Sequence, residues 1–220
     1  MTLSNSITFR WYAICVQPQI PDRDTQEVVD ALRRSIALSG LSQAAFARAV
    51  GTSAPRMSTY LSGATRPSAW FCFRARRLAN ALSNARERRL MSAPETAAEI
   101  RRALRAGETA WAWRMLLQGR DHLRLLLTDS AYNDLDLTGS WEAAPGPTGN
   151  VGFDALLAAL ASHEFDEAGV TAPEWTRIEP LEEDWRPPHP FLSPERVVAR
   201  TPPWLRRLHI YVPERDLATA

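Results

Sequence analysis

The earliest regular pattern of apolar and polar residues is helical and starts near residue 24. Asp24 and Glu27 have the spacing of a capping box, and Gly40 is the residue type that ends helices in the left-handed conformation. Apolar residues between them recur every three or four positions, as on one face of an amphipathic helix: Val28, Val29, Leu32, Ile36 and Leu38. The pattern predicts a helix over residues 24–39.

Two short helices joined by a tight turn are predicted next. Ser42 is a favourable N-cap for a helix over residues 41–50, and Gly51 suits the left-handed residue that ends it. Ser53 caps the following helix, which Gly63 ends. Its apolar stripe consists of Met57, Tyr60 and Leu61. Each short helix therefore carries its own start and stop signals.

The middle of the chain is predicted to contain longer helices followed by a connection. The periodicity indicates helices over residues 68–90, 92–106 and 109–127, the last with a kink near Gly119. Residues 129–150 contain several glycines and prolines, which interrupt regular structure. We expect this segment to be a linker.

The last part of the chain begins with an amphipathic helix over residues 151–169 and then becomes irregular. Nine prolines interrupt every longer pattern after residue 170. Short helices near 194–200 and 203–207 and a short strand at 209–212 are the regular elements expected there. Aromatic residues suggest that this region packs a small core of its own: Trp175, Trp185, Phe191, Trp204 and Tyr211.

The expected fold is mainly α. An N-terminal five-helix domain is predicted at residues 25–91, after a flexible arm at 1–24. A helical connector at 92–128 and the linker at 129–150 lead to a small, mostly α C-terminal domain with irregular proline-rich segments at 151–220.

Charge divides the chain into two unlike parts. Up to Thr128 there are 19 Arg and 9 acidic residues, a net charge of +10, and after it there are 7 Arg and 16 acidic residues, a net charge of −9. A basic segment favours an anionic partner, of which nucleic acid is the commonest. The absence of lysine reflects the base composition of the genome rather than a mechanism. The positions of the arginines are therefore more informative than how many there are.

The remaining composition predicts a cytoplasmic protein without membrane spans. Cys15 and Cys72 provide neither a disulfide framework nor a metal-ligand cluster. No apolar run approaches the roughly 20 residues that cross a bilayer, and the stretch at 11–16 is too short for an export signal.

The residues give no support for an enzyme, a cofactor or a metal site. The four histidines are scattered, and His163 lacks the second histidine of a zinc-peptidase helix. There is no glycine-rich phosphate loop and no nucleophile elbow. Cys72 lies between Phe71 and Phe73, where a buried thiol is expected rather than a nucleophile.

The segment 41–63 resembles the helix-turn-helix of the Cro and phage-repressor family, called XRE. The likeness includes small Ala47 where two helices approach, Gly51 in the turn, apolar Met57 and Tyr60, and the closing Gly63, without an insertion. With its flanking helices it covers residues 25–91, which carry 11 Arg and 3 acidic residues. The resemblance implies a helix-turn-helix DNA-binding domain that reads double-stranded DNA as a homodimer on half-sites about 34 Å apart.

The same resemblance assigns candidate DNA-binding residues. Gln43 and Arg66 would contact phosphates, while the first turns of the second short helix would face the major groove, through Ser53, Ala54, Pro55, Arg56, Ser58 and Thr59. Arg56 is the best base reader, because its guanidinium can bind guanine O6 and N7 together. Ala54 and Pro55 stand where the family has long amides, so thymine-methyl contact or shape readout is expected there.

Two functions remain open for the whole chain. One is a transcriptional repressor, which would regulate its own operon in the simplest case. The alternative is an antitoxin that represses its operon and neutralises a toxin through the acidic residues 151–220. For this C-terminal part, an accessory core or the sensing of a small ligand are further alternatives.

Overall fold

The computed structural model describes residues 22–129, 131–132 and 137–218. Within these ranges the protein is built from α-helices and short 3₁₀ turns, so the mainly α class is confirmed. The strand predicted at 209–212 is wrong: a single β-bridge joins Trp185 to Ile210. Prolines at 187 and 188, two and three residues after Trp185, cannot donate to a ladder, which limits the pairing on that side.

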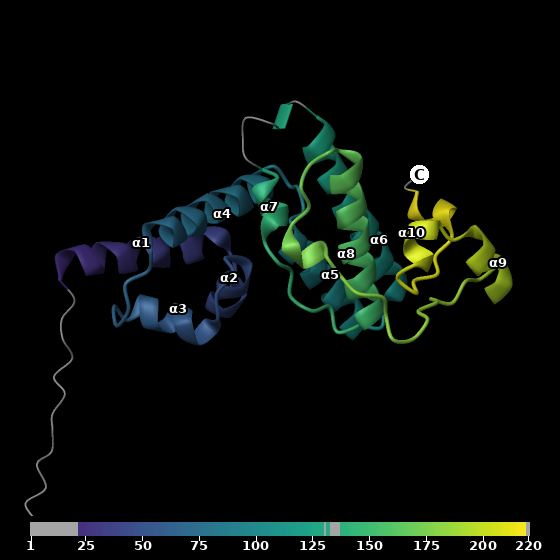
Figure 1. Cartoon of the computed structure of the whole chain (residues 1–220), viewed down its shortest axis with the longest axis horizontal. Helices are drawn as coiled ribbons and strands as arrows, with labels where there is room; N and C mark the ends of the chain where they lie inside the picture. Colours follow the sequence, from purple (N-terminus) through teal and green to yellow (C-terminus); the bar gives the residue numbers. More distant parts are fainter. Residues whose placement is uncertain (1–21, 130, 133–136, 219–220) are drawn as a thin grey trace, which may run out of the picture.

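Four helices form the N-terminal body, defined here as residues 22–90. They are α1 (Arg23–Ser39), α2 (Gln43–Ala49), α3 (Ala54–Leu61) and α4 (Ala69–Glu87). In Figure 1 they occupy the left of the molecule, with α1 alongside α4 and α3 at the outer edge. Their buried side chains form one core, which includes Leu32, Phe46, Val50, Met57, Phe71, Leu78 and Leu82.

The predicted stop and start signals of these helices are used as expected. The side chains of Ser42, Ser53 and Ser68 each accept a hydrogen bond from a backbone N–H three residues later. Gly51 has φ +78° and Gly40 has φ +69°, the left-handed conformation that glycine adopts without strain. The sequence therefore located the turn between α2 and α3 correctly.

The N-cap of the first helix lies two residues before the predicted cap. Asp22, and not Asp24, is the N-cap of α1, and its carboxylate accepts from Thr25 N at 2.9 Å. The last three residues of the arm predicted at 1–24 therefore belong to α1, with residue 22 as its N-cap and residues 23 and 24 in its first turn. Residues 1–21 lie outside the described part of the chain.

A second body, defined here as residues 91–218, contains the larger core. It is built on α5 (Ala93–Arg105), α6 (Thr109–Thr128), α7 (Gly139–Glu142) and α8 (Val151–Glu167), with α6 packed between α5 and α8. The N-terminal domain was predicted to have five helices, but α5 contributes Ile100 and Ala103 to this second core. The segment predicted as a connector is therefore the centre of the second body.

The predicted linker contains one of the most buried side chains. Within its described part, Trp141 on α7 is 0% exposed, and its Nε1 donates to Met91 O at 2.9 Å. Trp175 Nε1 in turn donates to Trp141 O at 2.8 Å. Residues 137–148 are thus packed structure, with Leu137, Trp141, Ala143 and Thr148 buried.

The proline-rich C-terminal part packs onto this same core. Its short helices are η2 (Glu174–Thr176), α9 (Pro194–Arg200), α10 (Pro203–Arg206) and η3 (Glu214–Leu217). Leu205, Ile210 and Val212 are buried together with residues of α5, α6 and α8. The separate small core expected here is therefore absent from the described residues, and Phe191 is 83% exposed.

Helix α6 runs through Gly119 without interruption. A Cβ at this position would lie 2.4 Å from Thr96 Oγ1 and 2.5 Å from Thr96 Cγ2 on α5. The glycine therefore permits the close approach of α5 and α6 at this point.

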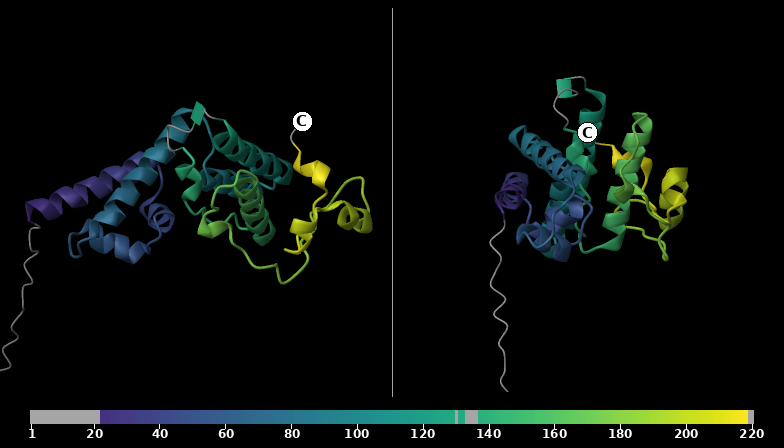
Figure 2. Two further views of the ribbon diagram at one scale, coloured as in Figure 1. Left: turned by 45° about the horizontal axis from the view of Figure 1, so that its top comes forward. Right: turned by 60° about the vertical axis from the view of Figure 1, so that its left-hand side comes forward.

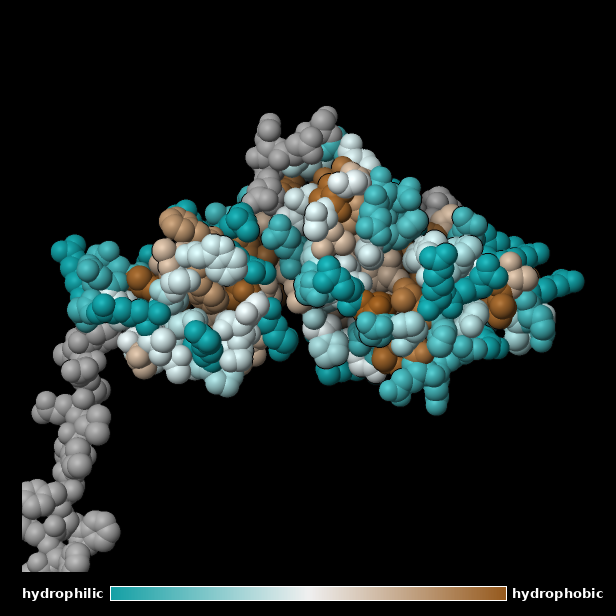
Figure 3. Space-filling model, viewed as in Figure 1, coloured by the Kyte–Doolittle hydropathy of each residue, from teal (hydrophilic) through white to brown (hydrophobic). Residues whose placement is uncertain are grey.

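The two bodies lie side by side and touch through α4 and α7 (Figure 2). Ala143, which follows α7, is buried in the N-terminal core, and Glu142 lies 3.9 Å from Arg77 on α4. In the view of Figure 3 the bodies form two lobes, and apolar side chains show between polar ones on the face of the second. None of the helices in the described ranges is both long and apolar enough to cross a membrane.

Candidate nucleic-acid interface

Helix α3 separates its side chains into a buried and an exposed face. Met57 is 0% exposed and Tyr60 is 6% exposed, and both belong to the N-terminal core. Of the eight candidate residues named from the sequence, Ala54 is half-buried and the other seven are exposed: Gln43, Ser53, Pro55, Arg56, Ser58, Thr59 and Arg66. The helix thus presents its polar side chains outward from a fixed support.

Side-chain hydrogen bonds fix two of the candidates relative to each other. Gln43 Nε2, at the start of α2, donates to Ser58 Oγ on α3 at 2.9 Å. Thr59 Oγ1 donates to Arg56 O at 2.8 Å, which satisfies the hydroxyl within the helix. The start of α2 and the middle of α3 therefore form one continuous polar surface.

Arg56 is held along the helix by Tyr60. Its Nε donates to Tyr60 Oη at 2.7 Å, and its guanidinium carbon lies 5.8 Å from the centre of the tyrosine ring. Tyr60 itself packs against Phe71 of α4, with ring centres 5.1 Å apart. The guanidinium is therefore directed by a residue that the core holds in place.

Arg66 lies in the loop after α3 and forms an ion pair with Asp22, which the sequence analysis did not identify. The backbone N–H and hydroxyl of Thr25 hold the pKa of Asp22 below its usual value, and the nearby Arg66 lowers that pKa further. The pair is exposed, so solvent screens it. The spacing Asp22 to Thr25 is that of an N-cap, which is the sequence signal that could have revealed this aspartate.

Most arginines of α4 have partners within the protein. Arg74 lies over Trp70 and Arg76 over Phe73, at 5.3 and 5.2 Å from the ring centres. Arg86 donates to Ser39 O and ties the end of α4 to the end of α1. Burial raises the pKa of the half-buried Cys72 thiol on this helix. The basic character of α4 is therefore partly structural.

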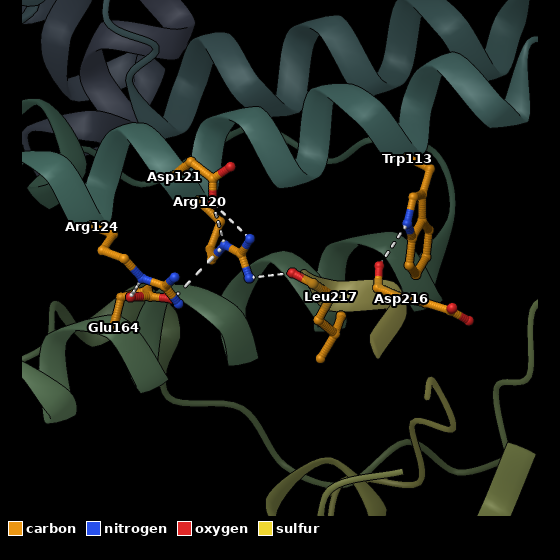
Figure 4. Close-up of polar contacts among 7 residues, drawn as sticks. All are labelled: Trp113, Arg120, Asp121, Arg124, Glu164, Asp216 and Leu217. Carbon is orange, nitrogen blue, oxygen red and sulfur yellow. Dashed lines mark hydrogen bonds and ion pairs between the residues drawn. The ribbon is translucent and has the colours of Figure 1, made fainter. Parts of the chain in front are cut away.

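A second cluster of charges lies far from α3, between α6 and α8 (Figure 4). Arg124 donates two hydrogen bonds to the Glu164 carboxylate, at 2.8 and 2.7 Å, which raises the pKa of the arginine. Arg120 is 5% exposed, and it donates to Asp121 Oδ1 and to Leu217 O at 2.6 Å. Because Arg120 is buried and one of its acceptors is the backbone carbonyl of Leu217, this cluster holds the C-terminal segment on α6.

Two further observations bear on the choice of function. In the described ranges, no three metal-ligating side chains of His, Cys, Asp or Glu converge. Comparison of the chain with models of protein families, with curated proteins and with solved structures gives no match.

Proposed function

We propose that this protein is a sequence-specific DNA-binding regulator that acts in the cytoplasm and inserts α3 into the major groove. The observation that carries the proposal is the two-faced α3, whose Met57 and Tyr60 are buried while Arg56, Ser58 and Thr59 are exposed. A helix supported in this way by a preceding helix can bring its first turns against base edges.

The roles of individual side chains follow from their positions. Arg56 is the proposed base reader, and Tyr60 limits the directions that its guanidinium can take, which lowers the entropy lost on binding. Gln43 and Arg66 are the proposed phosphate contacts. A phosphate that binds Arg66 competes with the Asp22 carboxylate, so Asp22 weakens binding to every DNA sequence alike.

The test is fluorescence-anisotropy titration of the full chain on DNA from its own upstream region and on a scrambled duplex, at two salt concentrations. Arg56→Ala should cost about 1 to 3 kcal/mol on the preferred duplex only, whereas Arg66→Ala should weaken both duplexes and reduce the salt slope by about 1. Asp22→Asn, which keeps a capping side chain, should strengthen both by about twofold. Equal losses on both duplexes for Arg56→Ala would refute the assignment.

Two copies are expected to act together, since a single short recognition helix covers only one half-site. Light scattering measures the number of copies in the particle, with and without the duplex. A monomer in both conditions would contradict a dimer on inverted half-sites.

An antitoxin role is the second candidate. It is favoured by an apolar groove of about 350 Å³ beside α8, where Val151 is 70% exposed and the carboxylates of Asp154 and Glu179 lie in the lining. An acidic margin around exposed apolar residues suits a basic protein partner. Co-expression with the product of the adjacent gene is the test. Growth inhibition by that product, relieved by this chain and not by a Val151→Asp variant, is the expected result.

A further inference from the structure

An open cavity of about 640 Å³ lies in the second body, away from α3. It is lined by the first half of α6, the segment 187–191 and the segment 211–218. This volume falls within the range of about 300 to 1,000 Å³ typical of small-molecule sites. Its size alone does not identify a ligand, but the residue types that line it indicate a chemical class.

Aromatic rings and prolines provide most of the wall. Trp113 comes from α6, Phe191 from the proline-rich segment and Tyr211 from the segment after α10. Four prolines complete the lining, at positions 187, 188, 190 and 213. Rings from three separate elements favour a flat, apolar body between them.

Hydrogen bonds hold these walls in place before any ligand arrives. His189 Nδ1 accepts from Phe191 N at 3.0 Å and from Leu192 N at 2.9 Å, so the proton lies on Nε2, which is 3.1 Å from Asp216 Oδ2. On the opposite side, Trp113 Nε1 donates to Asp216 O at 3.3 Å (Figure 4). The cavity is therefore formed in the free protein, which reduces the cost of binding.

One guanidinium at the rim can reach an anionic ligand. Asp216 is the one acidic residue in the lining, and its carboxylate already faces His189 and Arg215, the latter at 3.4 Å from Nε to Oδ1. The Arg215 side chain is 58% exposed and can turn toward a second anion. Arg215 is the one guanidinium of the lining, beside the single carboxylate of Asp216, and it is the group that can contact an anionic ligand.

We propose that this cavity binds a small aromatic acid, with the ring system between Trp113, Phe191 and Tyr211 and the anionic group at Arg215. The inference goes beyond DNA binding, because it gives the second body a ligand of its own. It does not depend on the role of α3, so it can fail or succeed independently of the proposed function.

The test uses two probes that fluoresce in apolar sites and differ in charge: 1-anilinonaphthalene-8-sulfonate, which is anionic, and N-phenyl-1-naphthylamine, which is neutral. Both are titrated into the full folded chain. We expect saturable binding at one site, with the sulfonate bound at least about fivefold more tightly than the amine because of the charge-assisted contact.

Three variants locate the probe. Phe191→Ala should weaken both probes at least about fivefold through loss of ring contact. Arg215→Gln should weaken the sulfonate about fivefold and leave the amine within about twofold. Phe73→Ala is the matched control, since Phe73 is an exposed aromatic of the N-terminal body, 60% exposed, and its removal should change neither probe.

Ala110→Trp provides a second line of evidence, because it adds a ring at an exposed lining position on the first turn of α6 and should block both probes. The proposal is overturned if neither probe shows saturable binding to the folded chain. It is equally overturned if Phe191→Ala and Ala110→Trp bind as the parent does, or if Arg215→Gln affects both probes equally.

Discussion

In the N-terminal body, arginines such as Arg56 and Arg76 lie at the surface, supported by rings of their own helix. In the second body, Arg120 is buried between Asp121 and the carbonyl of Leu217, 97 residues further along the chain. The same side chain thus serves as an available cation in one body and as an internal clamp in the other. Net charge does not distinguish these uses, whereas burial and partners do.

The largest effect on stability is expected at the buried cluster between α6 and α8. Glu164→Ala removes both acceptors of Arg124 and the carboxylate 3.9 Å from buried Arg120. We expect the free energy of unfolding to fall by about 3 kcal/mol, the low end for a buried pair because Arg124 is half-exposed. Urea denaturation followed by circular dichroism measures the loss. Asp166→Ala, an exposed acid of the same helix, should stay within about 0.5 kcal/mol, and equal losses for the two variants would rule out the clamp.

A change of the turn between α2 and α3 should instead affect the N-terminal body. Gly51 has φ +78°, and an added Cβ would meet nothing closer than 3.9 Å, so Gly51→Val strains the backbone without a clash. The expected loss is about 2 kcal/mol. Gly51→Asn should lose clearly less, because asparagine tolerates this conformation. Hydrogen exchange measured by mass spectrometry should show faster exchange in residues 41–63, and the same loss for both variants would argue against backbone strain.

Close packing of α5 on α6 gives a smaller effect in the second body. Gly119→Ala places a methyl group against Thr96, at a cost of about 1 to 3 kcal/mol, from which a gain of about 1 kcal/mol in helix propensity is subtracted. Thermal denaturation of Gly119→Ala, Thr96→Ala and the double variant tests the contact. The double variant should be less destabilised than the sum of the single ones, and strict additivity would show that the two residues do not collide.

The smallest expected effect depends on pH. His122 Nδ1 accepts from Met91 N at 2.8 Å, and burial lowers the pKa of the ring below its usual 6.5, against the opposing effect of Asp121. Since the unfolded chain takes up a proton at a higher pH than the folded chain, stability should decline as the pH falls below about 6.5.

His122→Asn keeps an acceptor for Met91 but does not titrate. Its free energy of unfolding should therefore change less than that of the parent between about pH 7.5 and about pH 5.5. Urea denaturation at both pH values measures the difference. An identical pH dependence in the parent and the variant would show that His122 does not contribute.

The sequence predicted the N-terminal body well, because its signals are local. Caps at Ser42 and Ser53, the turn at Gly51 and the stripe of Met57 and Tyr60 all act within a few residues. The predicted DNA contacts remain predictions. The structure shows that seven of the eight candidate residues are exposed. The ion pair of Asp22 with Arg66 could not be predicted, because the two residues are 44 positions apart in the sequence.

The second body was predicted less accurately, since distant contacts organise it. The sequence around Trp141 is typical of a linker, and distant contacts, such as those with Met91 and Trp175, make it a core residue. A glycine inside a helix, such as Gly119, is a sequence signal for a kink. The reason for a glycine at this position is the close approach of Thr96 on the neighbouring helix. Local periodicity contains no information about either partner.

The clamp between Arg120 and Leu217 also has a consequence for synthesis on the ribosome. All core residues of the N-terminal body except Ala143 precede residue 90, so most of its contacts exist as soon as α4 has emerged. Arg120 must wait for 97 further residues before its carbonyl partner is made, about 5 to 20 s at ordinary rates of elongation. During that interval the nascent chain exposes an unfinished second core beside a nearly complete first one, so a chaperone that recognises apolar surface would encounter the second body and not the first.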